Sequence, residues 1–339
     1  MKAKKIAVLG SGAIGASAAA CMAQAGLDVT LIDQWPAHVE AIRQNGLQVS
    51  VDGGTTRAAI PALHLCELAE CRAQFDVVMI GVKAYDTRWT AELIKRHLAP
   101  DALVIGLQNS LCDEEIIAAV GRARVVGCVV ELAAEVFEPG VLVRHTPPGK
   151  TWFGLGAYDA AVVPRLEEVA ELLRLGARVS LLDDVNAGKW TKLIANAVIL
   201  GPTALLGMQI KSAFELPGLR QAAAAIGTEA IAVAQACGQP IQAVFGLSAA
   251  ELQGAPDVVA RKLVDTIIDH IGPAARSAVY QDHLKGRYSE VDDVNGLVAA
   301  YGARHGIATP YNERVVALTG KIWSGELVPQ PDNVHLLID

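Results

Sequence analysis

The segment Ile6–Gly15, with the sequence IAVLGSGAIG, decides how the N-terminal part of the chain folds. Its first four residues are apolar and predict a short strand, and GSGAIG has the G-x-G-x-x-G spacing of a turn between a strand and a helix. A run of strong helix formers follows from Ala16 to Ala25, and Val29–Ile32 predicts a second strand. These parts together indicate a strand, a glycine turn, a helix and a second strand.

The glycine turn predicts a dinucleotide site, because each glycine has a mechanical reason to be there. Gly10 permits the tight turn, Gly12 lets a pyrophosphate approach the backbone, and Gly15 brings the helix close to the strand. Together with Ala13 and Ile14, the turn offers phosphates the unpaired N–H groups and positive dipole of a helix N-terminus. An incidental glycine-rich turn is the alternative, and it explains fewer of these residues.

Asp33, at the end of the second predicted strand, indicates which dinucleotide binds. A carboxylate at this point accepts hydrogen bonds from the adenosine ribose hydroxyls and repels a 2′-phosphate. No arginine follows it directly, although Arg43 lies in the next predicted helix. We therefore expect NAD as the cofactor, with NADP as the alternative.

Polar residues follow two further apolar strands, which we expect at 75–82 and 102–107. Lys83 comes after the first, and Gln108 and Asn109 come after the second. Ligands of open parallel sheets bind beyond the carboxyl ends of the strands, so Lys83 and Asn109 are candidate cofactor residues. For Lys83, an ordinary polar loop residue is an equally simple interpretation. More strands are expected at 125–130 and 152–156, with turns and short strands between 139 and 150.

The strand signal fades from about Asn186 onward, and helical runs dominate to near Ser324. We therefore expect two domains, a dinucleotide-binding domain at 1–185 and a helical substrate domain at 186–339. In the segment GKWTKLIANAV at 188–198, helical geometry places Lys189, Lys192 and Asn196 on one stripe, opposite an apolar face. That stripe alone is also what the solvated side of an amphipathic helix looks like.

Glu290 is a carboxylate in an unexpected position on the helix predicted to begin near Ser289. It falls within the apolar arc of that helix, whereas Asp292 lies on the far side. Ser289 and Asp292 have the spacing of a capping box, and the helix dipole favours a carboxylate in the first turn. A structural role is therefore sufficient for Glu290, but its inward direction also suggests a function.

The composition excludes several classes of partner. The 339 residues are 52% hydrophobic and carry a formal net charge of -7, which argues against a nucleic-acid or anionic-membrane surface and favours a small-molecule substrate. The apolar runs fall short of the roughly 20 residues of a membrane span. The six cysteines show no zinc-ligand spacing, so we expect no metal, buried thiols and a reducing, cytoplasmic location.

Taken in order, these motifs resemble the ketopantoate reductase (2-dehydropantoate 2-reductase) family. The resemblance runs over nearly the whole chain and rests on GSGAIG at 10–15, Lys83, Gln108-Asn109, the helix from Trp190 to Asn196, and the blocks at 281–296 and 306–310. It implies an α/β Rossmann-type N-terminal domain followed by an all-α C-terminal domain in a 6-phosphogluconate-dehydrogenase-like arrangement.

The resemblance also implies an activity, the NAD(P)H-dependent reduction of 2-dehydropantoate to pantoate in pantothenate biosynthesis. Lys192 would be the general acid, and Glu290 would hold the substrate hydroxyl or the lysine. Asn109 and Asn196 would orient substrate and cofactor, and Lys83 would lie near the cofactor. Lys189 would be a solvated neighbour of this site.

The sequence departs from the family pattern at several of its polar positions. Ser110 replaces the glycine of a Gln-Asn-Gly motif, and Ile199-Leu200-Gly201 stands where the family has Ile-Asn-Pro. Ala275 and Ala278 stand where the family has an asparagine and a serine that bind the substrate. The proton and hydride chemistry is therefore retained while the substrate contacts differ.

Between these two alanines, Arg276 and Ser277 are the candidates for replacing the lost substrate contacts. One alternative function is an NAD-dependent dehydrogenase of the same fold that acts on a bulkier or less polar alcohol or ketone. Another is a non-enzymatic NAD-binding sensor, which would need none of Lys192, Asn196 and Glu290. A homodimer is the oligomer we consider.

Overall fold

The computed structural model describes residues 4–242 and 247–338 of the chain. By its internal contacts the chain divides into two compact units, an N-terminal unit, Met1–Val185, and a C-terminal unit, Asn186–Asp339.

The N-terminal unit is built on an eight-stranded sheet with the strand order β12-β11-β8-β7-β6-β1-β2-β5. Pairing is parallel from β8 to β5, and β11 alone pairs antiparallel to its neighbour β8. The strands are β1 (Lys5–Leu9), β2 (Asp28–Asp33), β5 (Ala62–His64), β6 (Phe75–Ile80), β7 (Leu98–Gly106), β8 (Val125–Glu131), β11 (Trp152–Ala157) and β12 (Arg178–Leu181).

The chain order of these strands reverses at β1. From β1 the chain first builds outward through β2 and β5, and then returns to add β6, β7 and β8 on the other side. The carboxyl ends of β1 and β6 therefore form the topological switch point, where an open α/β sheet binds its ligands.

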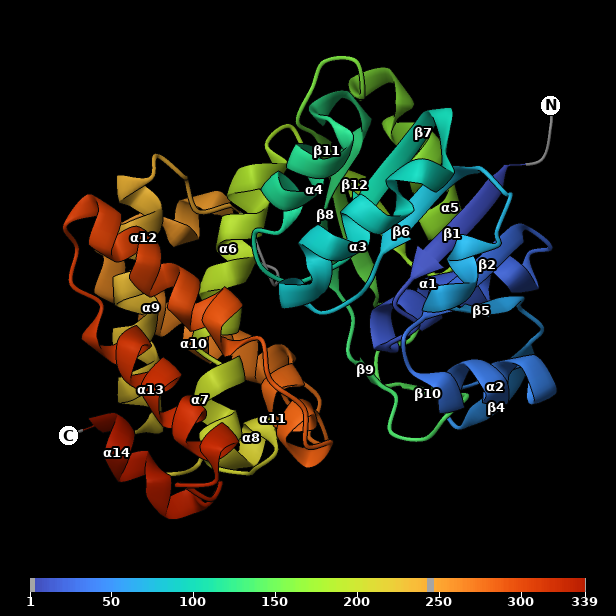
Figure 1. The fold of residues 1–339 in the computed structure, drawn as a ribbon. Coiled ribbons are helices and arrows are strands. Elements are labelled where there is room, and N and C mark those ends of the chain that lie inside the picture. Colours follow the sequence, from blue (N-terminus) through green and yellow to red (C-terminus); the bar gives the residue numbers. More distant parts are fainter. Residues whose placement is uncertain (1–3, 243–246, 339) are drawn as a thin grey trace. The chain divides into compact units, whose positions relative to one another are not determined.

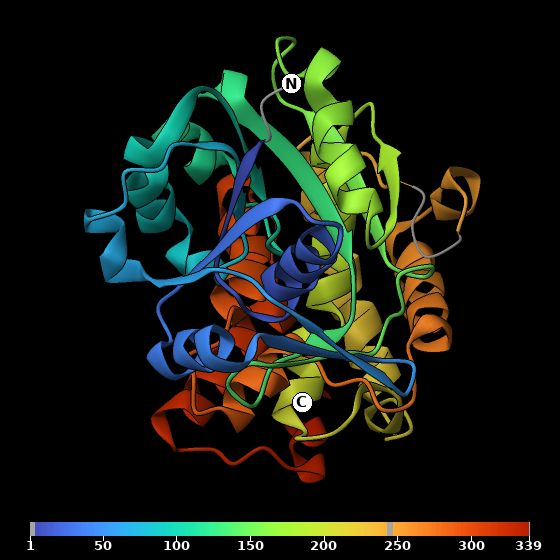
Figure 2. The ribbon, with the colours of Figure 1, turned by 90° about the vertical axis from the view of Figure 1, so that its right-hand side faces the viewer.

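Helices cover both faces of this sheet. Alternate residues of the central strand β1 therefore enter two different cores. Ile6 and Val8 pack in a core with α1 and α5, and Ala7 and Leu9 pack in a second core with α3 and α4. The two pairs of helices lie on opposite sides of the sheet in Figures 1 and 2. The helices of this unit are α1 (Ala13–Gln24), α2 (Pro36–Asn45), α3 (Thr87–Ile94), α4 (Asp113–Val120) and α5 (Leu166–Arg174).

A second, four-stranded sheet with the order β4-β3-β10-β9 lies beside α1 and α2 in the same unit. It joins two distant segments of the chain, because β10 pairs in parallel with β3. Its strands are β3 (Leu47–Val51), β4 (Gly54–Ala58), β9 (Ala134–Glu135) and β10 (Val141–Arg144). The sequence predicted short strands between 139 and 150 but not their pairing with the segment after α2.

In its described part, the C-terminal unit is built of helices and contains no β-strand (Figure 1). Its α-helices are α6 (Val185–Ala197), α7 (Leu200–Leu205), α8 (Ile210–Ala213), α9 (Leu219–Ala236), α10 (Pro256–His270), α11 (Ala278–Leu284), α12 (Leu297–His305), α13 (Pro310–Ser324) and α14 (Val334–Ile338). The predicted fold class, an α/β sheet domain with a helical C-terminal domain, is confirmed. None of the helices in the described segments combines the length and the hydropathy that crossing a bilayer requires.

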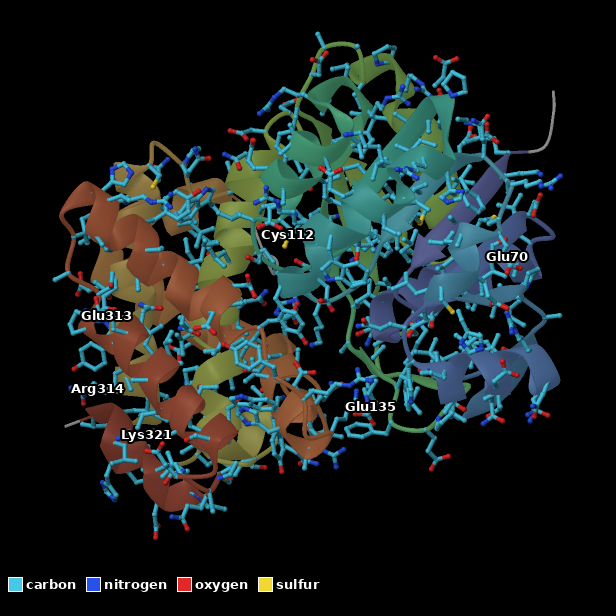
Figure 3. The ribbon with its side chains drawn as sticks, viewed as in Figure 1. Glu70, Cys112, Glu135, Glu313, Arg314 and Lys321 are labelled. Atoms are coloured by element: carbon cyan, nitrogen blue, oxygen red, sulfur yellow. The ribbon has the colours of Figure 1, made fainter. Side chains whose placement is uncertain are left out.

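The first helix begins at Ala13, directly after the glycine turn, where Ala16 donates its backbone N–H to Gly12 O. One local expectation is wrong. The cysteines are not uniformly buried, since only Cys112, labelled in Figure 3, and Cys128 are enclosed, whereas Cys66 is exposed.

Candidate active site

The glycine turn after β1 is packed against the end of β6 so closely that side chains are excluded. Gly10 has φ +89°, and a Cβ added to it would lie 2.5 Å from the backbone nitrogen of Val82. A Cβ on Gly15 would lie 2.1 Å from the carbonyl oxygen of Gly10. Gly81 closes the contact by donating its N–H to Leu9 O at 2.7 Å, and an added Cβ would lie 3.1 Å from Gly10 O. Three glycines therefore fix the backbone at the switch point.

Gly12 differs from the other two, because a Cβ on it would meet nothing within 4 Å. The space in front of it is open, and it directly precedes the first turn of α1. That turn contains no acidic residue, and no side chain caps it. The backbone N–H groups of Ala13, Ile14 and Gly15 are therefore available to an anionic ligand, so this turn fits the pyrophosphate of a dinucleotide.

Asp33, at the end of β2, lies against the same turn. Its Oδ2 accepts hydrogen bonds from the backbone N–H of Ser11 at 2.5 Å and from the Ser11 hydroxyl at 2.7 Å, and its Oδ1 accepts from Trp35 N at 2.8 Å. The side chain is half-buried. A carboxylate so placed can accept hydrogen bonds from ribose hydroxyls.

The side chain of Arg43, the one arginine that favoured NADP, is bound by other groups of the protein. Its Nε donates to Ala62 O at 2.7 Å, and its guanidinium contacts the carboxylates of Glu40 and Glu67. The hydrogen bond from Arg43 lowers the pKa of the Glu67 carboxyl below its ordinary value. The hydrogen bond to Ala62 O holds the guanidinium against β5, and the ion pairs hold it to Glu40 on α2 and to Glu67, just after β5.

Lys83 and Asn109 lie beyond the carboxyl ends of β6 and β7, which are neighbouring strands. Because these strands are parallel, both residues lie at the same edge of the sheet. Both side chains are half-buried. Gln108 is 6% exposed, and its Nε2 donates to Thr87 Oγ1 at 2.7 Å, which fastens the strand end to α3. Of the polar pair, Gln108 therefore has a packing role, and Asn109 is the more accessible member.

Ser110 has a backbone conformation that favours glycine, the residue expected at this position from the family pattern. Its φ is +74°, in the left-handed region that L side chains rarely adopt, and its side chain is buried. A glycine at this position would therefore adopt the observed conformation without strain.

In the C-terminal unit, α6 carries the polar stripe, and the stripe is not solvated. Lys189 is only 3% exposed and Asn196 only 6%, while Lys192 is half-buried. The expectation that Lys189 is a solvated neighbour is wrong. Hydrophobic periodicity identifies the apolar face of a helix, but it does not report whether other elements cover the polar face as well.

Glu290 is 6% exposed, so its predicted inward direction is confirmed. The predicted capping box is wrong: a π-helix, η7 (Asp292–Gly296), forms where an α-helix was expected, and Asp292 instead accepts a hydrogen bond from the hydroxyl of Tyr288. Short π-helical segments often occur at functional sites.

Asn295, in this π-helix, joins the Glu290 segment to α6. It is fully buried, and its Nδ2 donates to Ala197 O at 3.1 Å and to Asn312 Oδ1 at 2.9 Å. The backbone of the π-helix is thereby fastened to the last residue of α6, one residue beyond Asn196. Lys192 and Asn196 therefore lie on a helix that is hydrogen-bonded to the π-helix that follows Glu290.

Of the two candidate replacements for substrate contacts, Arg276 is exposed and Ser277 is buried. The Ser277 hydroxyl donates to Leu200 O at 3.0 Å and accepts from Tyr280 N at 3.2 Å, which caps α11. These bonds give Ser277 a structural role.

Sequence reasoning missed Gly81 and Asn295. Gly81 interrupts an apolar strand, and a glycine in that position is a recognised sign of close backbone approach. Asn295 gave no such sign, because its partners Ala197 and Asn312 are distant in the sequence.

Comparisons with known proteins agree over most of the chain. The family model described as ketopantoate reductase PanE/ApbA matches residues 6–157, and its C-terminal counterpart matches residues 184–322. A 2-dehydropantoate 2-reductase from Archaeoglobus fulgidus is 29% identical over 327 residues, which cover 96% of this chain and all of the relative.

Solved structures give the same result. A ketopantoate reductase from Ralstonia eutropha JMP134 is 27% identical, with a TM-score of 0.79 over 95% of this chain and 99% of the other. D-mandelate dehydrogenase, in a ternary structure with NADH and anilino(oxo)acetate, is 22% identical with a TM-score of 0.83 over 95% and 99%, and shows the fold alone. The protein therefore belongs to the ketopantoate reductase family, and it is a nicotinamide-dependent oxidoreductase acting on CH–OH groups.

Proposed function

We propose that this protein reduces a small 2-oxo acid, with 2-dehydropantoate as the named substrate, NADH as the preferred cofactor and Lys192 as the general acid. The observation that carries the proposal is the enclosed polar stripe of α6, in which half-buried Lys192 and buried Asn196 lie one helical turn apart. Asn295 fastens this helix to the segment that carries buried Glu290.

The chemistry follows from the charges of these groups. When bound, the dihydronicotinamide supplies the hydride that reduces the carbonyl carbon. The Lys192 ammonium donates a hydrogen bond to the carbonyl oxygen, stabilises the negative charge that develops on it, and transfers the proton that completes the alcohol. Glu290 accepts a hydrogen bond from the substrate hydroxyl or from the Lys192 ammonium, and Asn109 and Asn196 orient the reacting groups.

The preference for NADH is supported by two side chains of the N-terminal unit. Asp33 presents a carboxylate to the glycine turn through Ser11, and a 2′-phosphate beside it would be repelled. Arg43, the arginine considered as a partner for a 2′-phosphate, is held by Ala62, Glu40 and Glu67. Gly10, Gly12, Ala13, Ile14, Gly15 and Lys83 complete the proposed cofactor site.

A second candidate is reduction of a bulkier or less polar 2-oxo acid or ketone by the same groups. It is favoured by Leu200, Ala275 and Ala278, which stand where the family carries polar residues, and by the structural hydrogen bonds that occupy Ser277. Arg276, which is exposed, is then the residue we propose for a substrate carboxylate.

The direct experiment is to follow oxidation of NADH, and separately of NADPH, with 2-dehydropantoate, smaller 2-oxo acids and aryl 2-oxo acids. For Lys192→Ala we expect a loss of turnover of about 10²–10⁴-fold, with NADH binding retained. Lys321→Ala is the matched control, because Lys321 is exposed on α13 (Figure 3).

Unchanged turnover in Lys192→Ala would contradict the proposed mechanism. NADH binding by the wild type without turnover of any carbonyl would favour the sensor function instead. The proposal includes a homodimer, and light scattering of the wild type at assay concentration tests it.

A further inference from the structure

His38, on α2, is a buried imidazole that connects the glycine turn to the small sheet. It is 1% exposed, with Nε2 3.0 Å from Ser11 O and Nδ1 2.8 Å from the backbone nitrogen of Gly140. The Gly140 N–H can only donate, so Nδ1 accepts and Nε2 carries the proton that it donates to Ser11 O. These two partners assign the imidazole to a single neutral tautomer.

On the side of the turn, the contact completes the immobilisation of Ser11. The N–H and hydroxyl of Ser11 donate to Asp33, and its carbonyl oxygen accepts from His38. Ser11 is 1% exposed and lies between Gly10 and Gly12. Its position therefore sets where the backbone passes in front of α1.

On the other side, Gly140 is itself firmly held. It has φ +74°, its carbonyl oxygen accepts from Gln48 N at 2.9 Å, and a Cβ on it would lie 3.0 Å from Ala41 Cβ. The ring of Trp35 stacks on His38 with the centroids 5.2 Å apart and an interplanar angle of 12°. The imidazole is thus fixed on both edges and on one face.

We propose that His38 is a positioning residue for the dinucleotide, which holds the Ser11 carbonyl so that the glycine turn keeps its shape when a ribose binds Asp33. The inference rests on the proposed function, in which this turn binds the cofactor. Both hydrogen bonds from Ser11 end on the same oxygen, Oδ2 of Asp33. A ribose hydroxyl that donates to this carboxylate competes with the Ser11 hydroxyl, and the bond from His38 does not take part in that exchange.

Two substitutions each remove one of the two hydrogen bonds of the imidazole and keep the other. In His38→Gln, the side-chain amide nitrogen reaches the place of Nε2 and keeps a donor for Ser11 O. In His38→Asn, the side-chain oxygen reaches the place of Nδ1 and keeps an acceptor for Gly140 N–H, while the donor for Ser11 is lost. The two amides are chemically matched, and unfolding midpoints of both variants report their general effect on stability.

We expect His38→Asn to raise the Kd and KM for NADH about tenfold with little change in kcat, as for loss of one hydrogen bond. His38→Gln should stay within about threefold of the wild type, which amounts to rescue by the variant that keeps the donor. If His38 only stabilised the fold, NADH affinity would instead fall in proportion to the loss of stability in both variants, whichever of the two hydrogen bonds each variant retained. Equal NADH affinity in wild type and His38→Asn would overturn the inference.

A measurement without cofactor separates this inference from the proposed function. Amide hydrogen exchange of the peptide that contains Gly10–Gly15 should be faster in His38→Asn than in wild type and close to wild type in His38→Gln. If exchange follows this pattern but the wild type binds neither NADH nor NADPH, the proposed function fails and the positioning of the turn stands. If exchange is unchanged in His38→Asn, the positioning role is refuted whatever the cofactor affinity.

Discussion

The carboxylate of Asp33 accepts two hydrogen bonds from Ser11, one from its N–H at 2.5 Å and one from its hydroxyl at 2.7 Å. The residue that we propose to select the cofactor therefore also holds the glycine turn that we propose to bind it. Its two tasks differ in their dependence on charge, because the turn needs an acceptor, whereas repulsion of a 2′-phosphate needs a negative charge.

Asp33→Asn should therefore reduce the preference for NADH. The amide retains one acceptor oxygen and loses the charge, so the Kd for NADH should rise about tenfold or more while the Kd for NADPH changes less. Fluorescence titration with both cofactors measures the ratio. Ser11→Ala is the control, since it removes only the hydroxyl and should leave the ratio unchanged. An unaltered ratio in Asp33→Asn would show that selection lies elsewhere.

Ser110→Gly should stabilise the protein. Ser110 has φ +74°, and relieving a left-handed serine should raise the free energy of unfolding by ~1 kcal/mol. Chemical denaturation of the two proteins gives the difference. Ser110→Ala keeps the unfavourable backbone conformation and loses the hydroxyl, so it should show no gain. Equal stability of the glycine and alanine variants would refute the attribution to backbone conformation.

The Tyr288 phenol should lose its proton at a higher pH than an ordinary tyrosine. Its hydroxyl donates to the carboxylate of Asp292, and this hydrogen bond, with burial and the charges of Asp292 and Asp293, raises its pKa to about 12. The raised pKa favours the neutral phenol in the folded protein. Its contribution to stability is therefore complete below the ordinary pKa of about 10 and is lost as the pH rises through about 12.

The difference in near-ultraviolet absorbance between wild type and Tyr288→Phe isolates the titration of this phenol from those of the other tyrosines. Asp292→Asn should move the transition back toward about pH 10. A transition near pH 10 in the wild type would show that the hydrogen bond is not maintained in solution.

The sequence predicted the strand, turn and helix at 6–32 well, because that information is local. The spacing of Gly10, Gly12 and Gly15 has one mechanical solution, and the strands beside it are apolar and buried. The inward direction of Glu290 was also predicted correctly, because helical periodicity shows which residues share a face of a helix.

What the sequence did not predict depends on contacts between distant segments. The pairing of β3 with β10 joins short strands that are partly exposed, so neither carries a strong pattern. The burial of Lys189 depends on what covers α6. Asn295, inside the π-helix at Asp292–Gly296, bonds to Ala197, which lies 98 residues earlier in the chain. His38 gave no signal either, because both of its partners are backbone groups, which every residue possesses.

The parallel pairing of β3 with β10 has a consequence for the order in which the protein can form during synthesis. Gly140 lies about a hundred residues after His38 along the chain, so the small sheet and the anchor of the Ser11 carbonyl cannot exist until the ribosome has released that segment. The strand, turn and helix that begin the chain can assemble much earlier. A nascent chain therefore passes through an interval in which the glycine turn has formed but His38 still lacks its hydrogen bond from Gly140.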